Sequence, residues 1–132
     1  MAWGEILAVF IVSHLVGDFL LQTSWQANHK REGLGRDPVA RRALLSHIST
    51  YGLAFVPAFV WLAADVEAWV LAVAALVLVP HLVQDDGRLI ARYIAGVKHA
   101  EVREGELLAV AVDQSFHAVA LFGVALLAGA LA

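Results

Sequence analysis

The chain has 132 residues, of which 61% are hydrophobic and 16% charged, and its formal net charge is −3. Soluble globular domains are about 45–50% apolar and about 25% charged, so this composition, with a mean hydropathy of +0.74, disfavours that class. The charge gives no reason to expect nucleic acid as a partner. Because the sequence has no cysteine, it excludes disulfides, thiolate zinc sites, iron–sulfur clusters and cysteine nucleophiles.

Four apolar stretches predict membrane-spanning helices over residues 3–24, 38–63, 67–94 and 106–131. Each is long enough to cross a hydrocarbon core about 30 Å thick at a rise of about 1.5 Å per residue. Asp37 and Pro38 predict the start of the second helix, since aspartate caps helices and proline suits the first helical position. We therefore expect a single transmembrane domain over residues 1–132, an all-α integral membrane four-helix bundle.

Basic residues gather in two of the three connections. Residues 25–42 contain Lys30, Arg31, Arg36, Arg41 and Arg42, and residues 88–105 contain Arg88, Arg92, Lys98 and Arg103. The N-terminus and the link near Asp65 contain no Lys or Arg. Because cytoplasmic loops of membrane proteins are enriched in Lys and Arg, both basic connections are expected in the cytoplasm and both termini outside, an N-out/C-out arrangement.

Three histidine–aspartate pairs share one spacing within the apolar stretches. They are His14 with Asp18, His81 with Asp85, and Asp113 with His117. The spacing i, i+4 puts both members on one face of a helix. Ionisable groups at bilayer depth cost roughly 2.5–3.5 kcal/mol each on insertion scales, so three such pairs indicate a functional site. With His47 they all fall in the cytoplasmic half of the predicted bundle, which predicts one layer of metal ligands drawn from all four helices.

Four imidazoles and three carboxylates exceed what one tetrahedral ion needs, so we expect two divalent transition metal ions with bridging carboxylates. This ligand mixture suits Zn, Mn or Fe and does not choose among them. A dinuclear site activates water near neutral pH and stabilises both oxygens of a phosphoryl displacement. Asp85 and Asp113 are the candidate catalytic groups, Asp113 as a general base or a ligand. Buried hydrogen-bonded pairs and a proton or ion pathway remain the alternative interpretations.

Residues beside these ligands are candidates for supporting roles. Gln22, one turn beyond Asp18, and Gln114, beside Asp113, would orient a ligand or form a hydrogen bond between helices. Asp86 is expected to face a charge such as Arg88 rather than the metals, because it lies about 100° around the helix from Asp85. Five basic residues are candidates for binding an anionic substrate, with headgroup anchoring as the alternative: Lys30, Arg41, Arg42, Arg88 and Arg92.

Four motifs follow one another along the chain: HLVGDFLLQTSWQANHK (14–30), a lone His47, HLVQD (81–85) and DQSFH (113–117). In this order they resemble a bacterial membrane family known as domain of unknown function 3307, and the resemblance covers nearly the whole chain. It implies a multi-pass protein of the bacterial inner (cytoplasmic) membrane. The chain is more loosely similar to small inner-membrane metal-dependent hydrolases, which also distribute His and Asp over membrane helices, and this similarity favours hydrolysis.

The resulting hypothesis is a dinuclear-metal-dependent hydrolase, surrounded by membrane lipid, that cleaves an ester or phosphoester of a lipid-like anionic substrate at the cytoplasmic face. A di-iron-type oxidoreductase is an alternative, although such sites usually contain Glu-x-x-His motifs. A metal or proton transport or binding protein is another, although the outer half of the predicted bundle has few polar residues. Gly123, Ala128 and Gly129 would permit close helix packing in a homo-oligomer.

Overall fold

The computed structural model describes residues 1–101 and 106–132, which form helices and short connections with no strand among them. The elements are α1 (Trp3–Leu15), a π-helical turn η1 (Val16–Leu20), α2 (Ser24–His29), α3 (Pro38–Val66), a 3-10 turn η2 (Glu67–Trp69), α4 (Val70–Asp85), α5 (Arg88–Val97) and α6 (Leu107–Leu131). The predicted all-α class is confirmed. Arg103, counted in the second basic connection, lies outside the described residues.

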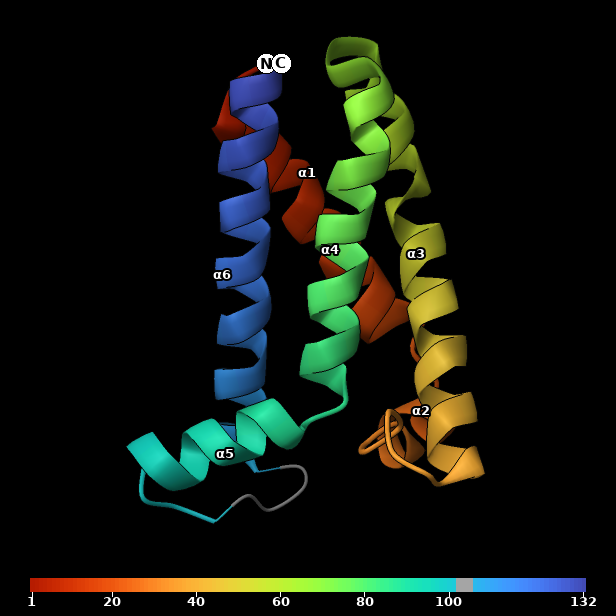
Figure 1. Ribbon diagram of the computed structural model, residues 1–132, viewed down its shortest axis with the longest axis vertical. Coiled ribbons are helices and arrows are strands. Elements are labelled where there is room, and N and C mark those ends of the chain that lie inside the picture. The colour runs from red at the N-terminus through yellow and green to blue at the C-terminus, as the bar shows by residue number, and fades with distance from the viewer. Residues whose placement is uncertain (102–105) are drawn as a thin grey trace.

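Of the long helices, α3, α4 and α6 run along the molecule and α1 crosses it obliquely (Figure 1). The short helices α2 and α5 lie at one end. Both termini and the η2 turn lie at the opposite end. There α1 packs closely on α6, since a Cβ added to Gly129 would lie only 3.0 Å from the Trp3 Cβ. From this contact α1 passes behind α4 towards α3 (Figure 1).

Three helical stretches are long and apolar enough to cross a membrane: Trp3–Leu20, Pro38–Asp85 and Leu107–Leu131. The second has 48 residues because α3, η2 and α4 follow one another without a break, yet the chain reverses direction within it (Figure 1). Large apolar side chains lie exposed on the outer faces, such as Val60 at 70% and Leu71 at 75%. Apolar surface of this extent is typical of contact with lipid, and it indicates a membrane protein.

Two of the predicted helices are divided in the structure. The helix predicted over 3–24 ends at Leu20, and α2 starts anew because Thr23 and Gln26 form a capping box. The Thr23 hydroxyl accepts a hydrogen bond from the Gln26 N–H (3.2 Å), and the Gln26 side chain accepts one from the Thr23 N–H (2.9 Å). The helix predicted over 67–94 is interrupted at Gly87, whose φ of 79° is left-handed and ends α4 before α5 begins.

The other two predicted helices differ from the structure only at their ends. The helix predicted over 38–63 extends to Val66, and the one predicted over 106–131 spans Leu107–Leu131. The start of α3 is as predicted: the Asp37 carboxylate accepts a hydrogen bond from the Val39 N–H (2.8 Å), and Pro38 occupies the first helical position. The cap and the proline therefore fix where this helix begins.

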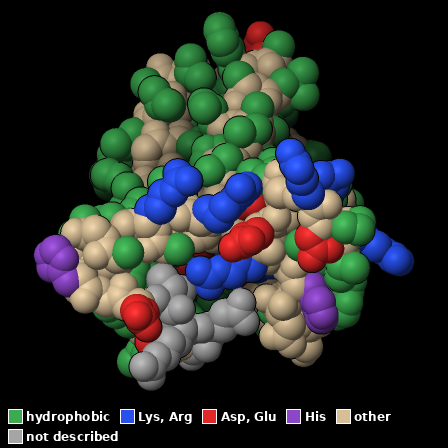
Figure 2. Space-filling model, turned by 60° about the horizontal axis from the view of Figure 1, so that its bottom comes forward, with side chains coloured by type: hydrophobic (Ala, Val, Ile, Leu, Met, Phe, Trp, Pro, Cys, Tyr) green, Lys and Arg blue, Asp and Glu red, His purple; other side chains and the backbone are tan. Residues whose placement is uncertain are grey.

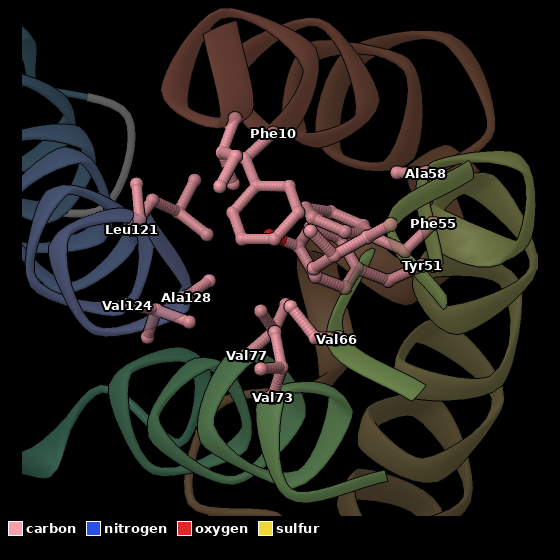
Figure 3. Close-up of a cluster of buried hydrophobic side chains, with 13 residues drawn as sticks. Phe10, Tyr51, Phe55, Ala58, Val66, Val73, Val77, Leu121, Val124 and Ala128 are labelled. Carbon is pink, nitrogen blue, oxygen red and sulfur yellow. The ribbon is translucent and has the colours of Figure 1, made fainter. Parts of the chain in front are cut away.

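An apolar core fills the space between the long helices on the side of the termini. Phe10 of α1, Phe55 of α3, Val77 of α4 and Leu121 of α6 converge there (Figure 3). Ala128 is fully buried in the same core, and Gly129 packs on Trp3 of its own chain. Ala128 and Gly129 therefore pack within the chain itself. Of the three residues proposed for close packing in an oligomer, Gly123 has open space beside it.

Asp86 joins the two basic connections. Its carboxylate accepts hydrogen bonds from the Leu34 N–H (2.8 Å) and Arg88 Nε (2.6 Å), and its carbonyl accepts one from the Glu32 N–H (2.8 Å). Burial acts to raise the pKa of this carboxyl, but the bonds from Arg88 and Leu34 prevail and lower its pKa. The expected pairing of Asp86 with Arg88 is confirmed. The segment after α2 is thereby held against the end of α4.

Charged side chains gather at the end of the molecule where α2 and α5 lie. Figure 2 shows Lys and Arg side chains grouped with acidic ones on this face, while hydrophobic side chains cover the flanks above it. α5 crosses this end and buries Ile90 and Ile94, which pack with Phe116 of α6. The molecule therefore has one polar end with a strong mixed charge and an apolar body.

Candidate metal centre

Four buried side chains bring their ligand atoms within 4.8 Å of one another: Asp18 on η1, His81 and Asp85 on α4, and His117 on α6. His47 of α3 adjoins this cluster. Its Nε2 lies 2.8 Å from Asp85 Oδ2 and 3.2 Å from Asp18 Oδ1. The helices that hold these residues are far apart in sequence, so the cluster exists only in the folded chain. We call these five residues the central cluster.

The spacing of the central cluster matches the coordination shell of a small divalent ion. His81 Nε2 lies 3.3 Å from Asp18 Oδ1 and 3.2 Å from Asp85 Oδ2, and His117 Nε2 lies 3.2 Å from Asp85 Oδ1. Ligands held 2.0–2.1 Å from a tetrahedral ion are about 3.3 Å from one another. These three imidazole–carboxylate separations are therefore close to those that such an ion requires.

Hydrogen bonding alone leaves this cluster incompletely satisfied. Asp18 Oδ1 is buried and has no hydrogen-bond partner among the described residues, although two imidazole nitrogens lie within 3.3 Å of it. Nε2 of His47 and Nε2 of His81 face each other at 3.3 Å. A buried acceptor without a partner costs about 1–3 kcal/mol. An ion shared by these atoms would satisfy the carboxylate oxygen and both nitrogens, so the donor set fits a metal.

The remaining two predicted ligands lie at the edge of the central cluster. His14 Nε2 is 3.8 Å from Asp18 Oδ2, and Asp113 Oδ2 is 3.7 Å from His117 Nε2. His14 is hydrogen-bonded on both sides, to the Tyr51 hydroxyl (3.0 Å) and to Gln114 Oε1 (2.9 Å). The structure thus brings all seven predicted ligands into one layer, with five at its centre and two at its margin.

The η1 turn explains why Asp18 reaches the centre while His14 stays at the edge. A regular helix would stack residues four apart on one face. The π-helical turn starts between the two residues and widens the backbone, and the Asp18 carboxylate approaches His47 and His81 more closely than it approaches His14. Such turns occur mostly within α-helices and frequently at functional sites. The local irregularity therefore shapes the site.

Three polar side chains support the imidazoles from outside. Gln114 donates to Asp18 Oδ2 and Asp113 Oδ2, both at 3.3 Å, in addition to its bond with His14. The Gln84 side-chain oxygen is hydrogen-bonded to His117 Nδ1. The Tyr51 ring stacks on His81 with 3.5 Å between ring centroids. Such contacts fix the orientation of ligand rings.

Sequence reasoning named Gln114 but missed Gln84 and Tyr51. The spacing of both residues from predicted ligands could have identified them. Tyr51 lies four residues after His47, and Gln84 lies three residues after His81, so each shares a helical face with a predicted ligand. The prediction named the amides next to Asp18 and Asp113 but did not extend the same search to the faces shared with His47 and His81.

Lys30 enters the site from the segment that follows α2. Its Nζ donates to Asp85 Oδ2 (2.8 Å) and to Gln22 Oε1 (2.6 Å). Gln22 thus contacts the central cluster through Lys30, which it holds beside Asp85. The bond from Lys30 gives Asp85 a cation partner in addition to its imidazole neighbours. Asp85 is therefore the residue on which the interactions of this site converge.

A cavity of about 370 Å³ opens beside the central cluster. Its lining includes Asp18, Asp85 and Asp113 together with Gln22, Lys30 and Arg31. The other four basic residues predicted to bind an anionic substrate form contacts away from the cavity or are exposed. Arg41 donates to the Gly35 carbonyl, Arg42 lies over the Trp25 ring, Arg88 pairs with Asp86, and Arg92 is exposed on α5. None of these four lines the cavity, whereas Lys30 does, and so does Arg31, which was not among the candidates. A role of these four in binding substrate stays a prediction.

Apolar helices around a buried imidazole–carboxylate cluster define a helical membrane protein with a candidate metal site. Residues 6–131 match the family described as protein of unknown function (DUF3307), and the chain belongs to this family. The resemblance seen in the four motifs is thereby confirmed. No curated protein and no solved structure gives a significant match to the chain.

Proposed function

We propose that the chain is a membrane-embedded, metal-dependent hydrolase that acts on an ester or phosphoester of a lipid-like substrate at the cytoplasmic face. One observation supports this most: the Asp18 and Asp85 carboxylates of the central cluster line an open cavity, where a substrate can reach them, and the imidazoles lie directly behind these carboxylates. A purely structural cluster of buried ion pairs would have no need of such access. The looser similarity to membrane hydrolases points in the same direction.

The proposed cofactor is a pair of divalent ions, Zn, Mn or Fe. Asp18, His47, His81, Asp85 and His117 would hold the first, and His14 and Asp113, at the margin of the layer, are the nearest groups for a second. Two such ions would offset the charge of three carboxylates in an apolar surrounding. When bound, they would supply Lewis-acid activation of water near neutral pH.

Asp113 is the proposed general base. Its side chain is 30% exposed and lines the cavity, whereas the Asp85 side chain is 1% exposed and engaged by Lys30 and the imidazoles. The Gln114 amide holds one oxygen of Asp113 in place at 3.3 Å. Asp113 can therefore take a proton from a molecule in the cavity and pass it to solvent. Asp85 is proposed to act as a ligand that keeps the imidazoles in position.

The proposed setting is a four-helix bundle in the bacterial inner membrane with both termini outside. The location of the basic connections at the end opposite the termini supports this orientation. α5 suits the interface on the cytoplasmic side, since it buries Ile90 and Ile94 while Arg88 and Arg92 are exposed. The central cluster would then lie near the headgroups of the inner leaflet.

Cysteine labelling in spheroplasts tests this orientation. The native chain has no cysteine, so a single cysteine introduced at the exposed residue Asp65 or Lys98 is the only site in the protein that a maleimide can label. A membrane-impermeant maleimide is expected to label Asp65→Cys in intact spheroplasts and Lys98→Cys only after the membrane is opened. The reverse pattern would place the site at the outer face and contradict the proposal.

Elemental analysis of detergent-purified protein tests the metal. We expect close to two transition-metal ions per chain and a large loss of metal in His81→Ala, because His81 contacts both central carboxylates. His29→Ala is the matched control, since His29 is exposed and stacks on Trp25 away from the cluster. Absence of stoichiometric metal, or an equal metal content in the His81→Ala and His29→Ala variants, would contradict the proposed hydrolase.

Transport is the less supported function. A carrier needs a polar route to both faces, but the described interior beyond Tyr51 is filled by apolar side chains such as Phe10, Phe55 and Val77 (Figure 3). Zinc in the purified protein would favour hydrolysis over redox chemistry, because zinc is redox-inactive, whereas iron or manganese would leave both functions open. An iron-dependent absorption band that changes on reduction would favour the oxidoreductase.

A further inference from the structure

The cavity beside the central cluster has two chemically different sides. On one side lie the cations and amides of α2 and the segment after it, namely Asn28, Lys30 and Arg31. On the other lie apolar side chains of η1 and α6, chiefly Phe19 and Val110. These two are 57% and 44% exposed, so they also form part of the outer surface of the helices. One cavity thus borders both the polar end and the lipid-facing flank.

The course of α1 accounts for the apolar side. Near the termini α1 packs tightly on α6, where Gly129 meets Trp3. Towards the polar end α1 and η1 move away behind α4 and contact α3 (Figure 1). The cavity is lined from both η1 and α6 at this level. An entrance between them would face the lipid rather than the water.

The polar side has the chemistry that recognises phosphate. Lys30 is a compact ammonium with several donors, its side chain is only 16% exposed, and its present acceptors are Asp85 and Gln22. The Arg31 side chain, beside Gly87, adds a second cation to the lining. Ammonium and guanidinium groups form strong charge-assisted hydrogen bonds with phosphate oxygens. Once the carboxylates at the floor are neutralised by bound metal, Lys30 is available for an anion in the cavity.

The geometry points to a site for the phosphate headgroup of an anionic membrane lipid, which enters sideways between η1 and α6, is anchored by Lys30, and leaves its chains against Phe19 and Val110. This inference rests on the proposed function, because the three carboxylates lining the cavity would repel an anion without the metal. It narrows the substrate class from esters in general to phosphoesters of lipids. It also assigns the anion-binding role to Lys30, with Arg31 in support.

Titration calorimetry on zinc-loaded protein in a phosphate-free maltoside detergent tests this site. One ligand is a nonhydrolysable phosphonate analogue of short-chain phosphatidic acid, and the other is inorganic phosphate. Lys30→Gln is expected to weaken binding of both ligands by about tenfold, the effect of losing one charge-assisted hydrogen bond. Lys30→Arg should bind nearly as the native protein does. Lys98→Gln, the same change at an exposed lysine outside the cavity lining, should have no effect.

Val110→Trp distinguishes a lipid site from a site for the free ion. A larger side chain on the lipid-facing lip is expected to weaken the phosphonate lipid by about tenfold and to leave inorganic phosphate unchanged. Equal affinity of the lipid for the native and Val110→Trp proteins would overturn sideways entry. Unchanged affinity in zinc-loaded Lys30→Gln would overturn the site itself.

Zinc content, measured on every variant, separates the possible failures. A native protein that binds none of zinc, manganese and iron would contradict the proposed function and this inference with it. A native protein that binds zinc but shows no dependence on Lys30 would contradict the inference alone. A Lys30→Gln protein that keeps its zinc and loses phosphate affinity supports both.

Discussion

Replacing Asp85 by asparagine is expected to abolish metal binding and to lower the free energy of unfolding by about 3 kcal/mol. Asp85 receives Lys30 at 2.8 Å, His47 at 2.8 Å and His81 at 3.2 Å. Without its charge, the Lys30 ammonium loses the one ion pair that it forms among the described residues. Breaking a buried ion pair by removing one member costs about 3–5 kcal/mol, and the partial exposure of Lys30 favours the lower value.

A second substitution separates the two effects. Lys30→Met in the Asp85→Asn background removes the stranded cation, so much of the stability should return, because losing both members of a buried pair is far less costly than losing one. Metal binding should stay lost, since Met supplies no hard ligand. Asp65→Asn, at an exposed aspartate near the end of α3, serves as the control. The measurements are metal content and reversible unfolding in mixed micelles, and retained metal in Asp85→Asn would refute the assignment.

The substitution Gly17→Ala is expected to destabilise the protein by about 2 kcal/mol and to weaken metal binding, although it adds only a methyl group. Gly17 lies in η1 between His14 and Asp18, and a Cβ there would stand 2.5 Å from Tyr51 Cδ2. Tyr51 cannot easily retreat, because its ring stacks on His81 and its hydroxyl is bonded to His14. Either Asp18 or His81 must therefore move.

The matched control is Gly123→Ala in α6, where nothing lies within 4 Å of the added Cβ. There the same change should be neutral or stabilising by up to about 1 kcal/mol, through helix propensity alone. Combining Gly17→Ala with Tyr51→Leu should recover part of the lost stability, because the smaller side chain makes room. Equal unfolding free energies for the Gly17 and Gly123 variants would show that the contact with Tyr51 does not constrain the site.

The layer of metal ligands could be predicted from the sequence because it depends on spacings within single helices and on the charges of the connections. A spacing of four residues defines a helical face, and the alternation of basic and non-basic connections gives the direction of each helix. Together these two patterns predict that His14, His47, His81 and Asp113 lie at the same depth in the bundle. The structure places them in that layer. The membrane orientation, the metal and the reaction remain predictions.

The residues at the opening of the cavity could not be predicted in the same way, because contacts between distant parts of the sequence place them there. No periodicity signals that the Asp86 carboxylate captures the Leu34 N–H, or that Lys30 then reaches Asp85 across more than fifty positions of sequence. A rule based on charge alone ranked Arg41, Arg42, Arg88 and Arg92 equally with Lys30. The ends of α1 and α4 were also missed. A π-helical turn has no distinct sequence pattern, and the helix predicted over 67–94 ran through Gly87 although polar residues flank it.

The central cluster draws its residues from η1, α3, α4 and α6, which has a consequence for biogenesis. His117 lies on the last helix, so the cluster stays incomplete until that helix has joined the others. Until then Asp18, His47 and Asp85 lie in the membrane without their full set of neighbours, at an energetic cost that the finished bundle relieves. Metal loading would therefore be the closing step of assembly, and a chain truncated before α6 should be recognised by quality-control proteases rather than accumulate as a partly active form.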